Sequence, residues 1–220
     1  MSAPAAVIFD NDGLTLDTEG LWTLAEQRLF ERYDAEFSPA HKLELLGKSG
    51  ELAGRFLSEQ LGLPASAGLR LVGEMDELVF EAMEDGVEPM PGAVELLGAL
   101  AEAGIPRALC SNSPRPFVER AIERAGVAGF FEAVVTGDDV ENGKPDPAPY
   151  LETARRLGVD PAACVALEDS PPGAQSAHRA GMSVLVVPSF DGMDFEGAEE
   201  ATFASLSDPG IRERVGLLPA

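Results

Sequence analysis

Short apolar runs alternate along this chain with segments of helical periodicity. The runs are apolar at successive positions rather than at every second one, which is typical of strands buried on both faces of a sheet. They cover residues 5–10, 106–111, 132–137, 164–169 and 183–188, and the tail adds a short strand at 201–206. Strands that alternate with helices form parallel sheets with right-handed crossover connections. The pattern therefore predicts an α/β fold built on a parallel sheet.

One segment, residues 18–86, contains no convincing strand and interrupts this alternation. Its apolar positions predict helices at residues 19–34, 39–46, 50–61 and 66–85. In the first of these helices Trp22 and Leu29 share one face, which we expect to form part of a helix-bundle core. We therefore predict an inserted α-helical domain at 18–86, and a sheet domain made of residues 1–17 plus 87–220.

Polar side chains follow four of the predicted strands at the point where each strand ends. Asp10 and Asp12 follow the first strand, Ser111 and Asn112 the second, Lys144 the third, and Glu168 and Asp169 the fourth. The carboxyl ends of parallel strands meet at one edge of the sheet, where the ligands of open α/β sheets bind. We expect these carboxylates, the hydroxyl and the ammonium to converge there.

This combination of groups has a definite chemistry. Carboxylates that lie together must be protonated, paired with cations or bound to a metal ion, and an oxygen-only ligand set suits Mg²⁺. Such an ion attracts a phosphate group, which Lys144, Ser111 and nearby backbone N–H groups can also hold. One carboxylate can act as a nucleophile that forms an aspartyl-phosphate, and another as a general acid and base. The residues alone do not divide these roles between Asp10 and Asp12.

Charge and composition limit the classes of binding partner and the cellular location that we expect. The 220 residues carry a net charge of −22, which argues against a nucleic-acid backbone or an anionic membrane as partner but not against a small phosphorylated metabolite. We find neither an apolar stretch of ~18 residues nor a basic leader before one, so we expect no transmembrane helix, no signal peptide and a cytoplasmic location. Cys110 and Cys164 are expected to be reduced core thiols. A monomer is the default expectation.

The motifs, in this order and at strand ends, resemble those of the haloacid dehalogenase-like (HAD) hydrolase superfamily. The stretch DNDGLTLDTE, which starts at Asp10, resembles the first motif, and Ser111 matches the second. Lys144 in GKPDP matches the third, and Glu168 with Asp169 in LEDSPPG matches the fourth. The helical insertion resembles the cap of subfamily I, in the group of β-phosphoglucomutase and the sugar-phosphate phosphatases. The resemblance implies a Rossmann-like core with an inserted α-helical cap domain.

The resemblance also implies catalytic and metal-binding roles. Asp10 would be the nucleophile and a metal ligand. Asp12 would be the general acid and base, and would bind Mg²⁺ through its backbone carbonyl. Asp169 would bind the metal directly, and Glu168 directly or through a water.

The remaining motif residues would hold the substrate. Ser111, Asn112 and Lys144 would contact the transferring phosphoryl group. In the cap, Lys48 could face the substrate, although an exposed lysine is the more common outcome. Together the roles predict a Mg²⁺-dependent phosphatase that acts on a small phosphomonoester, such as a sugar phosphate.

The main alternative is a phosphomutase similar to β-phosphoglucomutase. That enzyme has a catalytic histidine early in the first cap helix, about where Trp22 stands in this chain. The stretch DTEGLW resembles the DSEPLW pattern of hexose-phosphate phosphatases, which favours hydrolysis. Dehalogenation is less favoured because that branch lacks the acid at the position of Asp12. A non-enzymatic scaffold is less favoured because no motif residue is lost.

Several other polar residues are expected to have structural roles. Their residue types and positions are typical of helix caps, turns and core contacts. They are Asp17 and Thr18 as caps of the first helix, Glu19 at its dipole, Asp146 in a turn, and His41 and His178 away from the strand ends.

Overall fold

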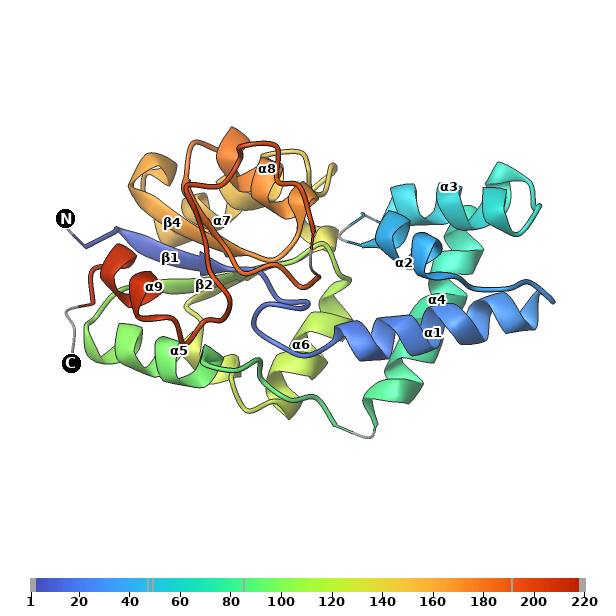
Figure 1. Ribbon diagram of the computed structural model, residues 1–220, viewed down its shortest axis with the longest axis horizontal. Coiled ribbons are helices and arrows are strands. Elements are labelled where there is room, and N and C mark those ends of the chain that lie inside the picture. Colours follow the sequence, from blue (N-terminus) through green and yellow to red (C-terminus); the bar gives the residue numbers. More distant parts are fainter. Residues whose placement is uncertain (1–2, 47, 49, 85, 191, 218–220) are drawn as a thin grey trace.

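The computed structural model describes residues 3–217 except 47, 49, 85 and 191, and it contains a six-stranded parallel sheet in the order β3-β2-β1-β4-β5-β6 (Figure 1). The strands are β1 (Ala6–Phe9), β2 (Arg107–Cys110), β3 (Ala133–Val135), β4 (Cys164–Glu168), β5 (Ser183–Val186) and β6 (Ala201–Thr202). The predicted parallel α/β architecture is confirmed, with strands shorter than most of the apolar runs. No helix in the described part of the chain is long and apolar enough to cross a membrane.

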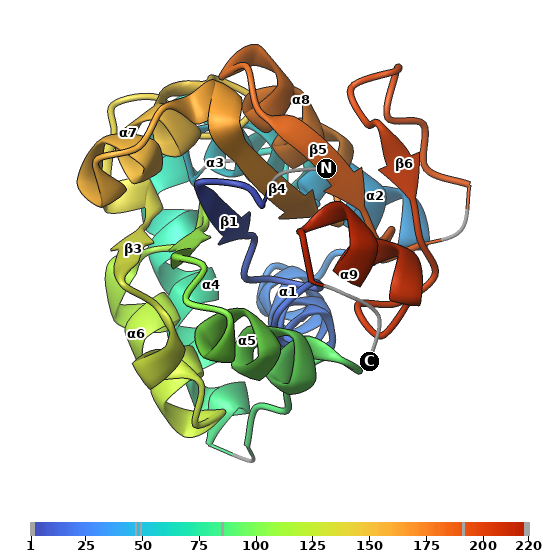
Figure 2. The same cartoon turned by 90° about the vertical axis from the view of Figure 1, so that its left-hand side faces the viewer.

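The sheet is covered on both faces, which explains the unbroken apolar runs. In β1, Val7 and Phe9 belong to one hydrophobic cluster, whereas Ala6 and Ile8 belong to another. Figure 2 shows α7 and α8 on one side of the sheet and α5 and α9 on the other. The covering helices are α5 (Ala93–Glu102), α6 (Arg115–Arg124), α7 (Ala148–Leu157), α8 (Pro171–Arg179) and α9 (Pro209–Arg214). Because both faces of the sheet are covered, a ligand can reach the sheet only at the ends of its strands.

The insertion between β1 and α5 is helical, as predicted. Its helices are α1 (Glu19–Arg32), α2 (Pro39–Leu45), α3 (Gly50–Gln60) and α4 (Gly68–Met83). Both α1 and α3 pack against α4, and Leu29, Leu57 and Leu71 are fully buried between them. The helix predicted at 66–85 begins later, at Gly68, because residues 65–67 form a 3₁₀ turn; residue 85 lies outside the described residues. The exact domain boundaries stay a prediction.

Two chain segments join the insertion to the sheet and run side by side. The N–H of Asp17 donates to the carbonyl of Glu88 at 2.8 Å, and the N–H of Met90 donates to the carbonyl of Thr15 at 2.9 Å. Leu16 forms an antiparallel bridge with Pro89 between these bonds. The insertion, which we call the cap, is thus attached through a paired strip rather than through two separate linkers.

The cysteines agree with the expectation of core thiols. Cys110 in β2 and Cys164 in β4 are buried and form no disulfide. Burial raises the pKa of Cys110 to about 12 and that of Cys164 to about 11. Both thiols therefore stay protonated and unreactive at neutral pH.

Candidate active site

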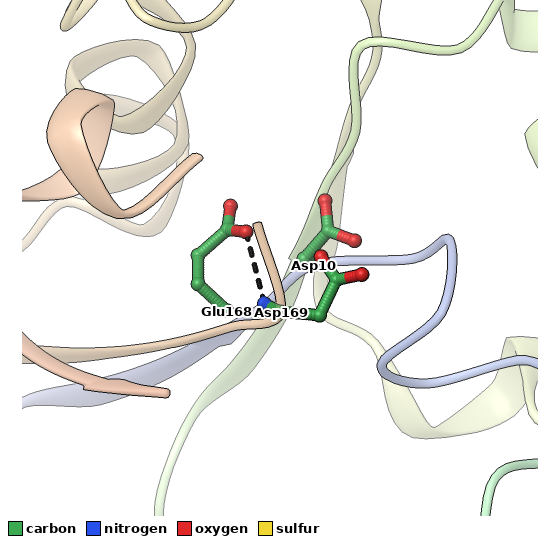
Figure 3. A group of neighbouring side chains, drawn as sticks. All are labelled: Asp10, Glu168 and Asp169. Atoms are coloured by element: carbon green, nitrogen blue, oxygen red, sulfur yellow. Dashed lines mark hydrogen bonds between the residues drawn. The ribbon is translucent and has the colours of Figure 1, made fainter. Parts of the chain in front are cut away.

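The polar ends of the strands meet at one edge of the sheet. Asp10 follows β1, Glu168 ends β4, and Asp169 comes directly after it. Figure 3 shows these three side chains next to one another at the strand ends. Lys144, from the loop before α7, reaches the same place. The parallel pairing of β1 with β4 brings the residues together across more than 150 positions of sequence.

Lys144 forms the centre of a closed network. Its Nζ donates to Asp10 Oδ1 at 2.5 Å, to Glu168 Oε1 at 2.6 Å and to the Cys110 carbonyl at 2.8 Å. An ammonium has three protons, so all three are used. Burial by itself lowers the pKa of Lys144, but Asp10 and Glu168 outweigh it and hold this pKa well above its ordinary value. The ammonium therefore stays charged.

Three carboxylates around this ammonium form a candidate metal site. Asp10, Glu168 and Asp169 each offer one oxygen, and these oxygens lie within 4.8 Å of one another. Burial, reinforced by the neighbouring carboxylates, raises the pKa of Asp10 and of Asp169 well above the ordinary value. Asp169 Oδ2 is buried and accepts no hydrogen bond from any described residue. A crowded oxygen set with an unused buried oxygen fits a hard divalent cation such as Mg²⁺.

Two glycines allow the chain to approach these carboxylates closely. Gly13 has φ +79°, and a Cβ at this position would lie 2.5 Å from Asp169 Oδ2. Gly173, in the first turn of α8, would place a Cβ 2.1 Å from the carboxyl carbon of Glu168. Side chains at either position would displace a carboxylate of the site. The glycines of DNDG and SPPG thus follow from the geometry of the site.

Asp12 accepts hydrogen bonds from four side chains. Its Oδ1 accepts from Thr18 Oγ1 at 2.7 Å and from Trp22 Nε1 at 3.1 Å. Its Oδ2 accepts from Ser111 Oγ at 3.0 Å and from Ser113 Oγ at 2.8 Å. Two of these donors lie at the start of the cap and two lie in the loop after β2. The side chain of Asp12 is therefore positioned by the cap and the sheet domain together.

These contacts correct the expected role of Thr18 and add polar partners to Trp22 and Glu19. Thr18 occupies the N-cap position of α1 but makes no side-chain capping bond, because its hydroxyl donates to Asp12. Trp22 packs against the hydrophobic core and on Phe117, as expected, and it also lines the cavity and donates to Asp12. The carboxylate of Glu19 forms an ion pair with Lys42 in addition to its place at the helix N-terminus. Helical periodicity identified the inward face of α1, but it did not show that polar residues on this face contact Asp12 and Lys42.

Other structural expectations agree with the described contacts. Asp146 Oδ1 accepts from the N–H of Ala148 at 2.9 Å, which is a turn contact. His41 accepts from the N–H of Ser38 at 3.2 Å and stacks on Phe30. His178 is exposed on α8. Asp17, in contrast, was expected to cap α1, but it is exposed just before the N-cap, and its side chain makes no capping bond with the described residues.

The residues expected to hold a phosphoryl group have protein partners in this structure. Ser111 donates to Asp12. Asn112 Oδ1 accepts from the N–H of Lys144 at 2.8 Å, and its Nδ2 donates to the Lys144 carbonyl at 3.2 Å. Asn112 thus ties the Lys144 loop to the loop after β2. Lys48 is half-buried in the cavity wall with its Nζ 3.2 Å from Glu44 Oε2. Phosphate contact by Ser111 and Asn112, and substrate contact by Lys48, stay predictions.

Sequence reasoning missed two residues of the site. Tyr150 is fully buried in α7, and its hydroxyl donates to Glu168 Oε1 at 2.5 Å. Ser113 supplies one of the donors to Asp12. Tyr150 could have been found, because it lies on the inward face of a predicted helix and a buried tyrosine hydroxyl needs a partner. Ser113 carried no comparable signal beyond its place in the triplet SNS.

A cavity of about 830 Å³ connects the strand ends with the cap. Asp10, Asp12 and Lys144 line it from the sheet domain, and Glu26 and Lys42 line it from the cap. This volume is suited to a small metabolite. The reactive carboxylates therefore lie at one wall of a chamber whose other wall is the cap.

The parallel sheet, the helical cap and the carboxylate–lysine centre define a hydrolase of the haloacid dehalogenase-like class. The sequence profile of the haloacid dehalogenase-like hydrolase family matches residues 4–181. The chain therefore belongs to this family, as the motifs predicted.

Individual relatives are similar over most of this chain. The bifunctional riboflavin kinase/FMN phosphatase of Arabidopsis thaliana is 33% identical over 192 residues; the match covers 84% of this chain but only 48% of that protein. Hexitol phosphatase B of Escherichia coli K12 is 30% identical over 192 residues, 86% of each protein. The crystal structure of CbbY from Rhodobacter sphaeroides in complex with phosphate has a TM-score of 0.81 and 28% identity, covering 94% of this chain and 96% of CbbY.

Proposed function

We propose that this protein is a Mg²⁺-dependent phosphatase that hydrolyses a small phosphomonoester, such as a sugar phosphate, through an aspartyl-phosphate on Asp10. The observation that supports this most is the position of Lys144, which is locked between Asp10 and Glu168 beside the unused oxygen of Asp169. The similarity to proteins named phosphatases supports the same reaction class.

The charge balance of the site suits a phosphoryl group. Asp10, Glu168 and Asp169 would hold Mg²⁺, together with the backbone carbonyl of Asp12. When bound, the ion offsets negative charge on the carboxylates and on the phosphoryl oxygens. Lys144 offers positive charge from the protein itself, already fixed in place. Charge neutralisation and positioning supply most of what phosphoryl transfer needs.

The reaction then proceeds in two displacements. An oxygen of Asp10 attacks phosphorus, the bond to the leaving group breaks, and the departing alkoxide takes a proton from the Asp12 carboxyl. A water then attacks phosphorus and gives its proton to the Asp12 carboxylate, which frees phosphate and Asp10. The four donors around Asp12 suit the second step, because they stabilise its carboxylate. One of them must turn away before Asp12 carries a proton.

The nucleophile is tested with Asp10→Asn. Wild-type protein is screened with Mg²⁺ against phosphorylated metabolites and p-nitrophenyl phosphate, and released phosphate is measured. We expect Asp10→Asn to reduce kcat/KM on the accepted substrates by at least about a thousandfold, since the covalent step is lost. Asp17→Asn, an exposed acid on the same segment, is the matched control and is expected to keep wild-type activity. Retained activity in Asp10→Asn would refute the mechanism.

The metal is tested by removal and by its effect on stability. EDTA should abolish phosphate release and added Mg²⁺ should restore it. Mg²⁺ at a hundred times its Kd should also stabilise the wild type by about 2.7 kcal/mol, because it binds only the folded chain. Asp169→Asn should lose most of this stabilisation in a denaturant titration. Equal stabilisation of both proteins would place the metal elsewhere.

The phosphomutase alternative has a direct test. Trp22 lies in the cavity wall where a mutase-type histidine would be expected, and its Nε1 donates to Asp12. An indole N–H cannot accept a proton at neutral pH, which favours hydrolysis. Isomerisation of β-glucose 1-phosphate, stimulated by the bisphosphate and faster than phosphate release, would instead favour the phosphomutase over the phosphatase.

A further inference from the structure

Two glutamates and one lysine form a buried cluster that the cap contributes to the cavity wall, with Glu19 the member nearest the strand ends. Glu19 and Glu26 lie two turns apart on α1 and therefore share one helix face. Lys42 of α2 reaches between them, with Nζ 2.7 Å from Glu19 Oε2 and 3.4 Å from Glu26 Oε2. All three residues line the cavity, so we call them the cap cluster.

The cap cluster holds one carboxylate more than its single ammonium can balance. The side chains of Glu19, Glu26 and Lys42 are 18%, 4% and 9% exposed. Burial raises the pKa of Glu26 to about 7 and also raises that of Glu19, and Lys42 offsets this only in part. The cluster therefore has more carboxylate oxygens facing the cavity than Lys42 can supply with hydrogen bonds.

A buried oxygen of this cluster lacks a hydrogen-bond donor. Apart from the ion pair with Lys42 at 3.4 Å, Glu26 Oε2 receives no hydrogen bond from any described residue. Buried polar atoms in folded proteins are almost always hydrogen-bonded. Because Glu26 lines the cavity, a donor on a bound ligand can supply the missing bond.

Among the described residues, the cap side of the cavity offers no unpaired cation for a second anionic group. Besides Lys42, the basic side chains that the described part of the cap contributes to the wall are Lys48 and Arg55. Lys48 lies 3.2 Å from Glu44, and Arg55 lies 2.6 Å from Glu51. A second phosphate or a carboxylate on the ligand would meet paired cations and the surplus acid of the cap cluster.

These observations deepen the proposed phosphatase function and rest on it. We propose that Glu19, Glu26 and Lys42 bind hydroxyl groups of the leaving group, so that the site selects monophosphates of uncharged polyols or sugars over bisphosphates and phosphorylated carboxylic acids. A hydroxyl both donates and accepts, which matches a lysine flanked by carboxylates. It donates to Glu26 and accepts from Lys42, while its phosphate lies at Lys144 across the cavity.

Matched substrates test this selection. We compare kcat/KM at pH 8 for sorbitol 6-phosphate with 6-phosphogluconate, and for fructose 6-phosphate with fructose 1,6-bisphosphate, with p-nitrophenyl phosphate as a hydroxyl-free reference. The first member of each pair should be preferred at least about tenfold, the effect of one charge-assisted hydrogen bond. Equal or reversed preference overturns the proposal, and so does a preference for phosphocholine, whose leaving group is a cation.

A binding measurement separates this proposal from the proposed function. In the Asp10→Asn background, calorimetry with sorbitol 6-phosphate and 6-phosphogluconate reports selection without turnover. Absence of phosphate release from every substrate tested with the wild type would count against the phosphatase, whereas equal affinity for sorbitol 6-phosphate and 6-phosphogluconate would count against the cap cluster.

The variant Glu26→Gln assigns the selection to the cluster. It keeps the side-chain shape but removes the charge. We expect kcat/KM for sorbitol 6-phosphate to fall about tenfold, mostly through a higher KM. The preference for sorbitol 6-phosphate over 6-phosphogluconate, measured as the ratio of their kcat/KM values, should become smaller. Glu141→Gln is the control, because Glu141 lines the same cavity but is exposed and, among the described residues, pairs with no cation. Thermal unfolding confirms that both variants are folded. An unchanged ratio in folded Glu26→Gln overturns the assignment.

Discussion

Two buried lysines, Lys144 and Lys42, each lie between two carboxylates, yet the two networks differ. Lys144 makes three short hydrogen bonds, at 2.5, 2.6 and 2.8 Å, and is almost completely buried. Lys42 has one close partner at 2.7 Å, and its nearest Glu26 oxygen is 3.4 Å away. The first network is complete without a ligand, whereas the second leaves an acceptor unused.

The difference follows from the elements that carry the residues. Asp10 and Glu168 sit at the ends of β1 and β4, which are paired in fixed register. Glu26 and Lys42 come from α1 and α2, which are joined by a loop and held by side-chain packing. A rigid sheet edge can hold reacting groups in fixed positions, whereas helices held by packing can adapt to a ligand. Under the proposed function Lys144 would serve catalysis and Lys42 would serve recognition of the leaving group.

The largest effect is expected where the closed network is broken. Lys144→Met leaves Asp10 and Glu168 buried without their cation, which should cost about 3–5 kcal/mol of unfolding free energy in EDTA. Lys42→Met should cost roughly 1–2 kcal/mol, because its network is looser and Glu19 is partly solvated. Urea titrations of the two variants measure the contrast. Equal losses would show that the two networks are energetically alike.

The buried carboxyl of Glu26 in the cap cluster predicts that the free energy of unfolding depends on pH. The pKa of Glu26 is about 7 in the folded chain against an ordinary value of 4.5, so the folded state binds the proton more tightly. The resulting stability is fully present below about pH 4.5 and is lost as the pH rises through about 7. Relative to Glu26→Gln, the wild type should lose on the order of 3 kcal/mol between pH 4.5 and 8.

This titration can be read from the difference between two denaturation series. Asp76, whose pKa burial raises to about 6, titrates in the same range but is present in both proteins and cancels. Parallel stability curves for the wild type and Glu26→Gln would show that Glu26 is not held out of water.

A smaller effect is expected from the support behind Glu168. Tyr150→Phe removes the hydroxyl that donates to Glu168 Oε1 and should cost about 2 kcal/mol, with weaker Mg²⁺ binding by calorimetry. Tyr33→Phe is the matched control, since the Tyr33 hydroxyl meets Glu74 in a half-buried place away from the site. A merely structural role for Tyr150 would change stability but leave Mg²⁺ affinity unaltered.

The smallest effect is expected at the contact between the cap and Asp12. Trp22→Phe removes one of four donors to Asp12 and keeps an aromatic ring beside Phe117. Losing about 1 kcal/mol of hydrogen bonding to Asp12 should leave its side chain less well positioned and lower kcat a few-fold, with KM nearly unchanged. An unchanged kcat would show that Trp22 contributes packing alone.

The sequence predicted the fold because its main signals are local. Apolar runs and helical periodicity placed the strands and cap helices, and parallel topology brought Asp10, Lys144, Glu168 and Asp169 to one edge. The same reasoning was wrong about the capping role of Thr18 and did not show that Trp22, besides packing on the core, donates to Asp12, since periodicity shows how a helix is turned but not which group it meets. It missed Tyr150 for the same reason.

By itself, then, the sequence determined the α/β class, the helical insertion and the strand-end carboxylates, because these depend on short-range patterning and on the geometry common to parallel sheets. Only the tertiary structure decided which side chains pair: Asp12 with Trp22, Asn112 with the Lys144 backbone, Lys42 with Glu26. Those pairings join residues of different elements and loops, 10 to 32 positions apart in the chain. They depend on how the helices pack and on which polar atoms burial leaves without water, and neither is encoded in any local period.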